Sequence, residues 1–255
     1  MRVTVCQLQN EAAAFEREWP ALVDHVRRER SQLVLLSEMV FAPWFALTPQ
    51  FNEAAWRRAV QSHERWLGRI GELAPASVLA TRPIDRGGRR FNEAFASDND
   101  VGYRAAHVKA LLPHEDGFHE SSWYHAGDPT FEPIKVRGAR VGFQICTEMW
   151  SMGHAQRYGK LGAQIIAVPR ATSRSSGEKW LAGGRVMAIV SGAYTLSSCR
   201  MTADPDVDLG GFGWIVSPDG EVLGITSSDE PFITRDIDLA VADRAKETYP
   251  RYALE

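Results

Sequence analysis

The sequence contains few cysteines and no excess of positive charge. Its three cysteines, at positions 6, 146 and 199, are an odd number at wide spacing and do not suggest a disulfide framework. The formal net charge is -3 at pH 7, and an acid interrupts the densest basic run, Arg27-Arg28-Glu29-Arg30. Neither a nucleic acid nor an anionic membrane surface is therefore expected as a partner.

Long hydrophobic runs are also absent. Residues 1–5 enter a strand-like run without the apolar stretch and small-residue cleavage site of a signal peptide. No segment is long and apolar enough to suggest a transmembrane helix. These absences predict a cytoplasmic location, where a free thiol stays available for chemistry.

The histidines of the central region show no metal-binding pattern. Their spacings include no pair of ligands one helical turn apart, so no metal is expected. The histidines weighed for this role are His107, His114, His119, His125 and His154.

What the sequence does contain is a set of short apolar runs, with 44% hydrophobic residues overall. Runs rich in β-branched residues predict strands at 3–8, 33–36, 78–81, 141–145, 165–168, 194–197 and 213–216. Helical spacing predicts helices at 20–30, 54–70, after Gly153 and at 180–190. Hairpins are expected for 91–96 with 101–107 and for 213–216 with 221–225. This alternation predicts an α/β fold with a mixed sheet covered by helices on one face, in one domain over residues 1–255.

Three of the runs end in a chemically active side chain. Glu38 follows the run 33–36, Lys109 follows 103–108, and Cys146 stands at the turn after 141–145. Catalytic groups favour the carboxyl ends of strands in α/β sheets. A thiol with a pKa near ~8.5 needs a base or a cation to react at neutral pH, which Glu38 and Lys109 can supply. Lys109 and the backbone N–H of Thr147 can then hold an oxyanion.

Each of these residues also has a plain structural interpretation. A buried cysteine is most often an inert core residue, which is the expected role of Cys6 and Cys199. Glu38 alone can cap a turn, and Lys109 alone can be a solvated strand end. The three residues together favour a catalytic role for Cys146 over a purely structural one.

With these motifs, the sequence resembles the nitrilase (carbon–nitrogen hydrolase) superfamily, whose catalytic residues are Glu, Lys and Cys in that order. The resemblance extends over nearly the whole chain. It is carried by residues 1–10, Leu35-Leu36-Ser37-Glu38, Val141-Gly142-Phe143-Gln144-Ile145-Cys146, 162–169 and 211–221. It implies a four-layer α-β-β-α sandwich, a homodimer or higher homo-oligomer, and a reaction that requires no cofactor.

The resemblance also implies a second glutamate that positions Lys109 and the substrate. Glu120 is expected to have this role because of its distance from the turn Gly127-Asp128, and Glu115 is the competing residue. Thr147 replaces the usual tryptophan after the cysteine, and Val108 stands where true nitrilases tend to have arginine. These departures favour a small amide or N-carbamoyl substrate over a nitrile. A catalytically idle binding or scaffold protein and acyl transfer to an amine remain alternatives.

Substrate contacts are predicted at two kinds of residue. Most large aromatic residues are simply core, but five are candidates for the pocket: Trp44, Phe45, Trp123, Tyr124 and Trp180. Trp44 and Trp123 are the best of these, because each follows a catalytic segment in a loop. Arg170 follows an apolar run and can bind a substrate carboxylate with its planar guanidinium. The equal alternative for Arg170 is an internal ion pair with Glu148 or Glu120.

Overall fold

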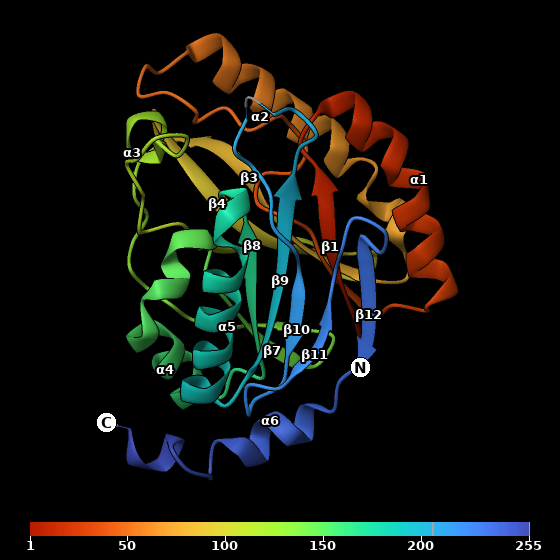
Figure 1. Ribbon diagram of the computed structural model, residues 1–255, viewed down its shortest axis with the longest axis vertical. Coiled ribbons are helices and arrows are strands. Elements are labelled where there is room, and N and C mark those ends of the chain that lie inside the picture. The colour runs from red at the N-terminus through yellow and green to blue at the C-terminus, as the bar shows by residue number, and fades with distance from the viewer. Residues whose placement is uncertain (206, 255) are drawn as a thin grey trace.

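The computed structural model describes residues 1–205 and 207–254 and shows two layers of strands between two layers of helices (Figure 1). The strands are β1 Arg2–Gln9, β2 Leu33–Leu35, β3 Ser77–Arg86, β4 Arg89–Asp98, β5 Gly102–Val108, β6 Ile134–Val136, β7 Ala139–Phe143, β8 Ile165–Arg170, β9 Tyr194–Met201, β10 Trp214–Val216, β11 Val222–Ile225 and β12 Phe232–Asp236. The α-helices are α1 Ala12–Arg28, α2 Glu53–Leu67, α3 Glu120–Trp123, α4 Met152–Lys160, α5 Gly177–Ser191 and α6 Leu239–Ala245. The 3-10 helices are η1 Ile70–Leu73, η2 Cys146–Trp150, η3 Arg174–Ser176 and η4 Arg251–Ala253.

The strands form one hydrogen-bonded network in the order β5-β4-β3-β2-β1-β9-β8-β7-β6, with β12 beside β1 and the β10–β11 hairpin beside β9. The central pairs, from β3 through β1 and β9 to β7, are parallel. Only three residue pairs join β1 to β9, from Gln7↔Cys199 to Gln9↔Met201. This short junction divides the network into two sheets that pack against each other.

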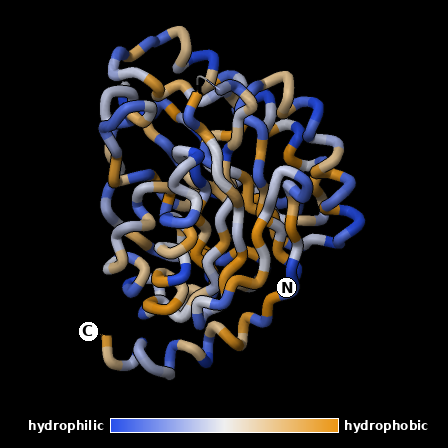
Figure 2. Tube along the Cα trace, viewed as in Figure 1, coloured by the Kyte–Doolittle hydropathy of each residue, from blue (hydrophilic) through white to orange (hydrophobic). Residues whose placement is uncertain are grey.

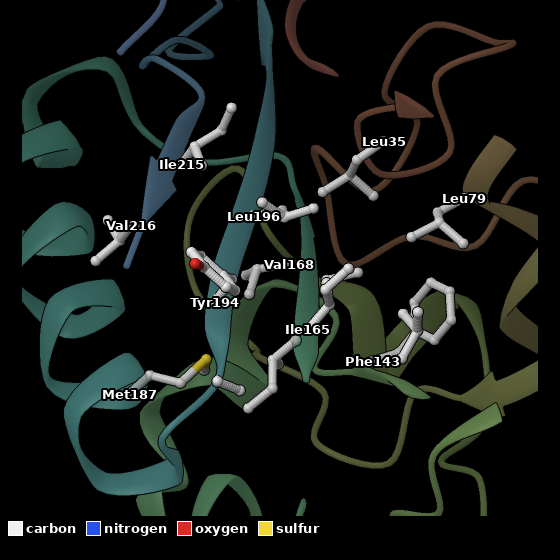
Figure 3. Close-up of a cluster of buried hydrophobic side chains, with 14 of the residues drawn as sticks. Leu35, Leu79, Phe143, Ile165, Val168, Met187, Tyr194, Leu196, Ile215 and Val216 are labelled. Carbon is white, nitrogen blue, oxygen red and sulfur yellow. The ribbon is translucent and has the colours of Figure 1, made fainter. Parts of the chain in front are cut away.

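Two apolar cores result from the alternation of side chains along the strands. Val3 and Val5 of β1 face the space between the sheets, whereas Cys6 and Leu8 belong to the core under α1 and α2. In Figure 3, Leu35 and Leu79 of the first sheet lie in one cluster with Phe143, Ile165 and Leu196 of the second. Figure 2 shows hydrophobic residues gathered along the central strands. Helices α4 and α5 cover the outer face of the second sheet, which completes the four-layer sandwich implied by the resemblance (Figure 1).

The structure differs from the sequence prediction at the first helix. α1 begins at Ala12, so Pro20 lies inside the helix and not in its first turn. Phe15, Trp19 and Val26 form a buried stripe on this helix. We infer that this packing outweighs the cost of an interior proline, which is about 3 kcal/mol.

Within residues 1–205 and 207–254, no helix has both the length and the apolar composition that crossing a bilayer would require.

Candidate active site

The three predicted catalytic residues lie together where their strands end. Glu38 follows β2, Lys109 follows β5, and Cys146 is the first residue of η2 after β7. Glu120 is the first residue of the short helix α3. Glu38, Lys109 and Glu120 are fully buried, and Cys146 is 3% exposed. The first sheet therefore supplies Glu38 and Lys109, and the second sheet supplies the thiol.

Lys109 bridges the two glutamates. Its Nζ donates hydrogen bonds to Glu38 Oε1 at 2.8 Å and to Glu120 Oε2 at 2.6 Å. Glu120 Oε2 also accepts a hydrogen bond from the Tyr124 hydroxyl. The second carboxylate oxygens, Glu38 Oε2 and Glu120 Oε1, are buried and have no hydrogen-bond partner among the described residues. These two oxygens remain available to a substrate or to a moving proton.

Charge and burial shift the proton affinities of this group. Burial would by itself lower the pKa of Lys109, but the adjacent Glu120 and Glu38 carboxylates raise it, so the amine stays protonated. Burial raises the pKa of Glu120 to about 7, despite the opposing effect of Lys109. One cation between two carboxylates therefore leaves Glu120 able to exchange a proton near neutral pH.

Cys146 is held in an unusual backbone conformation. Its φ of 48° lies in the left-handed region, which a non-glycine residue rarely adopts. The thiol donates a hydrogen bond to the Ala171 carbonyl, with an Sγ–O distance of 3.3 Å. Burial and the Glu38 carboxylate raise the pKa of this thiol well above its ordinary value. The resting residue is therefore a neutral thiol, and its reaction requires a base that takes the proton as the bond forms.

A buried arginine holds the segment that carries Glu38. Arg200, from β9, donates from Nε to the Glu38 carbonyl at 2.7 Å and from Nη2 to the Ala42 carbonyl at 2.5 Å. Asn92 of β4 donates from Nδ2 to Glu38 Oε1 at 2.8 Å. Arg200 is not among the site residues predicted from the sequence. The local signal was weak, because Arg200 lies within β9 and the preceding residues 194–199 include one threonine and two serines.

A pocket of 420 Å³ opens beside these residues. Cys146, Thr147 and Glu120 line it, together with the aromatic residues Trp150 and Trp180. Its remaining lining residues come from the loop after Lys109, the end of β8 and the start of α5: Pro113, His114, Glu115, Phe118, Ala171, Thr172, Ser173, Ser176 and Lys179. The structure thus places Glu120 against Lys109 and leaves Glu115 exposed on the pocket wall.

The predicted tryptophans do not line this pocket. Trp44 is 3% exposed and donates from Nε1 to the Gly117 carbonyl at 2.9 Å. Trp123 is equally buried and donates to the Thr48 carbonyl at 2.7 Å. Both pack in a mainly aromatic cluster that also contains Trp56 and Tyr124. Trp150 and Trp180 line the pocket instead, and their ring centroids lie 4.9 Å apart.

Arg170 is also not brought to the pocket. β8 extends through it to pair with Cys199, so its side chain is fully buried. Nε donates to the Ser197 hydroxyl at 2.7 Å, and the guanidinium carbon lies 4.1 Å from the centroid of the Trp214 ring. It pairs with neither Glu148 nor Glu120 in the hydrogen bonds of the described residues. Arg170 is thus internal, as in the alternative to substrate binding, but its partners are Ser197, Thr172 and Phe212 and neither of the two expected acids.

Comparison with known proteins agrees with this geometry. The family model for carbon-nitrogen hydrolases matches residues 2–247. The chain belongs to the carbon-nitrogen hydrolase family. The omega-amidase NIT2 of Xenopus tropicalis is 28% identical to it over 241 residues, which cover 90% of this chain and 84% of that protein. The human omega-amidase NIT2 is 27% identical over 98% of this chain and 92% of its own.

Solved structures of this family share the fold. A carbon-nitrogen hydrolase from Helicobacter pylori G27 aligns with a TM-score of 0.83 at 21% identity, over 99% of this chain and 94% of its own. A variant of the amidase from Nesterenkonia sp. AN1, determined in complex with butyramide, aligns with a TM-score of 0.77 at 16% identity, over 99% and 95% of the two chains. These structures thus share the fold of this chain, and the family match agrees with the carbon–nitrogen hydrolase resemblance of the sequence motifs.

Proposed function

We propose that this protein hydrolyses a small amide or N-carbamoyl compound through a thioester on Cys146. The observation that supports this most directly is the buried Lys109 held between Glu38 and Glu120, at 2.8 and 2.6 Å, in a site whose pocket exposes Cys146. The set contains a nucleophile, a base and a cation, which acyl transfer requires. It contains the groups for the whole reaction without a cofactor.

The proposed reaction has two stages. The Cys146 sulfur attacks the carbonyl carbon while Glu38 accepts the thiol proton, which matches the raised pKa of a thiol that is neutral at rest. Lys109 and the Thr147 backbone N–H stabilise the oxyanion, and Glu38 passes its proton to the leaving ammonia or amine. Glu38 then takes a proton from a water molecule, which hydrolyses the thioester and restores the thiol. Glu120 positions Lys109 throughout.

For the substrate, we propose an amide that carries a carboxylate at its other end. Lys179, in the first turns of α5, lines the pocket and lies over the Trp150 ring, with Nζ 5.7 Å from the ring centroid. No carboxylate of residues 1–205 or 207–254 forms a salt bridge with it, so its charge is available to a ligand. The relatives named omega-amidases agree with a terminal amide. Lys179 thus takes the role that the sequence had suggested for Arg170.

The test compares two substrates of equal length, succinamate and butyramide, by their ammonia release. Lys179→Met is expected to lower kcat/KM for succinamate by roughly tenfold, because a charge-assisted hydrogen bond is lost. Butyramide should be nearly unaffected, and Lys179→Arg, which keeps the charge, should retain the preference for succinamate. An equal loss on both substrates would show that Lys179 does not bind the carboxylate. A wild-type protein that releases no ammonia from any small amide, carbamoyl acid or nitrile would contradict the proposed function itself.

The domain organisation, location and oligomeric state of the protein are also proposed from the sequence. We expect one carbon-nitrogen hydrolase domain over residues 1–255, a cytoplasmic location, and a homodimer or higher homo-oligomer. In the family that the sequence resembles, subunits commonly join through the helices after the cysteine and after Trp180. Trp150 of η2 and Val186 of α5 leave 40% and 46% of their surface exposed in this region, which supports a subunit contact there.

A further inference from the structure

A third buried carboxylate of this region, Glu148 of η2, contacts both of the segments that carry Lys109 and Cys146. Its Oε2 accepts a hydrogen bond from the backbone N–H of Ile145, the residue before Cys146, at 2.7 Å. Its Oε1 accepts one from the backbone N–H of Ala110, the residue after Lys109, at 2.6 Å. Glu148 is fully buried and does not line the pocket. One side chain therefore joins the lysine segment to the cysteine turn.

No strand ladder makes this connection. β5 and β7 lie near opposite ends of the strand order and do not pair with each other in the described residues. The Lys109 backbone N–H donates to the Asn92 carbonyl at 2.9 Å, and the Lys109 carbonyl accepts from the Gly127 N–H at 2.9 Å. Neither partner belongs to the segment that carries Cys146. The Glu148 carboxylate is thus a direct link across the two sheets, next to both reacting groups.

The direction of this carboxylate is itself fixed. His107 Nε2, from β5, lies 3.0 Å from Oε1 and 2.9 Å from Oε2. The His107 ring packs 4.7 Å from Phe131, which stacks on His154 at 3.7 Å between ring centroids. A buried carboxylate with three donors and a packed partner has little freedom to turn.

We propose that Glu148 is a positioning residue, whose carboxylate sets the separation between the Cys146 thiol and the Lys109 ammonium. The inference rests on the proposed function, since it assigns that site a further residue. Glutamine cannot take this place, because the two backbone N–H groups bind different oxygens. In glutamine, one of these oxygens becomes an NH2 group, which donates and cannot accept. One of the two segments would then lose its anchor.

The experiment compares Glu148→Gln with Glu93→Gln. Glu93 is a matched control, because it is 2% exposed and paired with Arg82 and Arg86 outside the catalytic group. Glu148→Gln is expected to lower kcat for succinamate about 10²-fold with little change in KM, since a displacement of about 1 Å costs this much. Glu93→Gln should keep its kcat even if its melting temperature falls. Equal kcat losses in the two variants would overturn the proposal, as would an unchanged kcat in Glu148→Gln.

A second readout does not depend on any substrate. Lys109 lowers the pKa of the Cys146 thiol, so a displaced Lys109 should shift the pH profile of iodoacetamide labelling at Cys146 upward. An unshifted profile in Glu148→Gln would overturn the proposal even if the wild type proved inactive on every amide. Glu148→Asp keeps both acceptor oxygens and should retain more turnover than Glu148→Gln. If Glu148→Gln does not fold, Glu148→Asp still decides: its carboxylate is set back by one methylene group, so both hydrogen bonds lengthen and its labelling profile should shift upward by a smaller amount, and an unshifted profile would overturn the proposal.

Discussion

Cys146→Ala is expected to lower amide hydrolysis by about 10⁴-fold or more while the protein stays folded. Without the sulfur no thioester can form, and the remaining groups can only orient the substrate and polarise it. Ammonia release measures the loss, and circular dichroism with thermal melting establishes that the variant is folded. Cys199→Ala is the control, because that thiol is fully buried and outside the pocket lining.

Thiol labelling gives an independent check of the same residue. Cys146 lines the pocket, whereas Cys6 and Cys199 have no exposed surface. Iodoacetamide should therefore label Cys146 first in the folded wild-type protein, as peptide mass analysis would show. Equal labelling of all three thiols, or substantial turnover by Cys146→Ala, would contradict the assignment of the nucleophile.

Lys109→Met is expected to lower turnover by about 10²–10³-fold, the usual loss when one oxyanion donor is removed. It should also make folding dependent on pH, because two buried carboxylates would then lack their shared cation. In the wild-type protein, burial raises the pKa of Glu120 to about 7 even though the charge of Lys109 lowers it. Without Lys109 this pKa rises further.

The sign of the pH effect follows from linkage. A carboxyl whose pKa is raised on folding binds its proton more tightly in the folded than in the unfolded state. The contribution of this carboxyl to the free energy of unfolding is fully present below its unfolded pKa of about 4.3. It is lost as the pH rises through the pKa of the carboxyl in the folded protein. Melting temperatures of Lys109→Met should thus fall between about pH 5 and pH 8. The double variant Lys109→Met/Glu120→Gln should show a weaker fall, and a flat profile in the single variant would contradict this account.

The grouping of the proposed catalytic residues could be predicted from the sequence because each has a local signal. Glu38, Lys109 and Cys146 each stand just after a run predicted as a strand, and catalytic groups favour the carboxyl ends of strands in α/β sheets. Side chains at the ends of strands need no knowledge of distant packing to be placed there. The same reasoning predicted most strands within one or two residues.

The pocket walls could not be predicted in this way. Trp44 and Trp150 both follow a catalytic residue by a few positions, yet only Trp150 lines the pocket. The difference depends on how η2 and α5 pack together, which involves residues about 30 positions apart. Arg170 was misplaced because β8 extends to include it, a boundary that no local residue marks. The edge strand β12, which pairs with β1, was missed for a related reason, since its partner is more than 220 residues away.

The left-handed backbone at Cys146 implies that having a cysteine at this position lowers the stability of the folded protein. At a φ of 48° a side chain strains the backbone by about 1 kcal/mol or more, a strain that glycine avoids. Cys146→Gly should therefore unfold at a higher temperature than Cys146→Ala, the reverse of the ranking at most positions in regular structure. Denaturant unfolding of the two inactive variants would measure the difference, and a more stable alanine variant would contradict it. Selection for stability alone would favour glycine at this turn, so a cysteine here reflects a compromise between a durable protein and an active one.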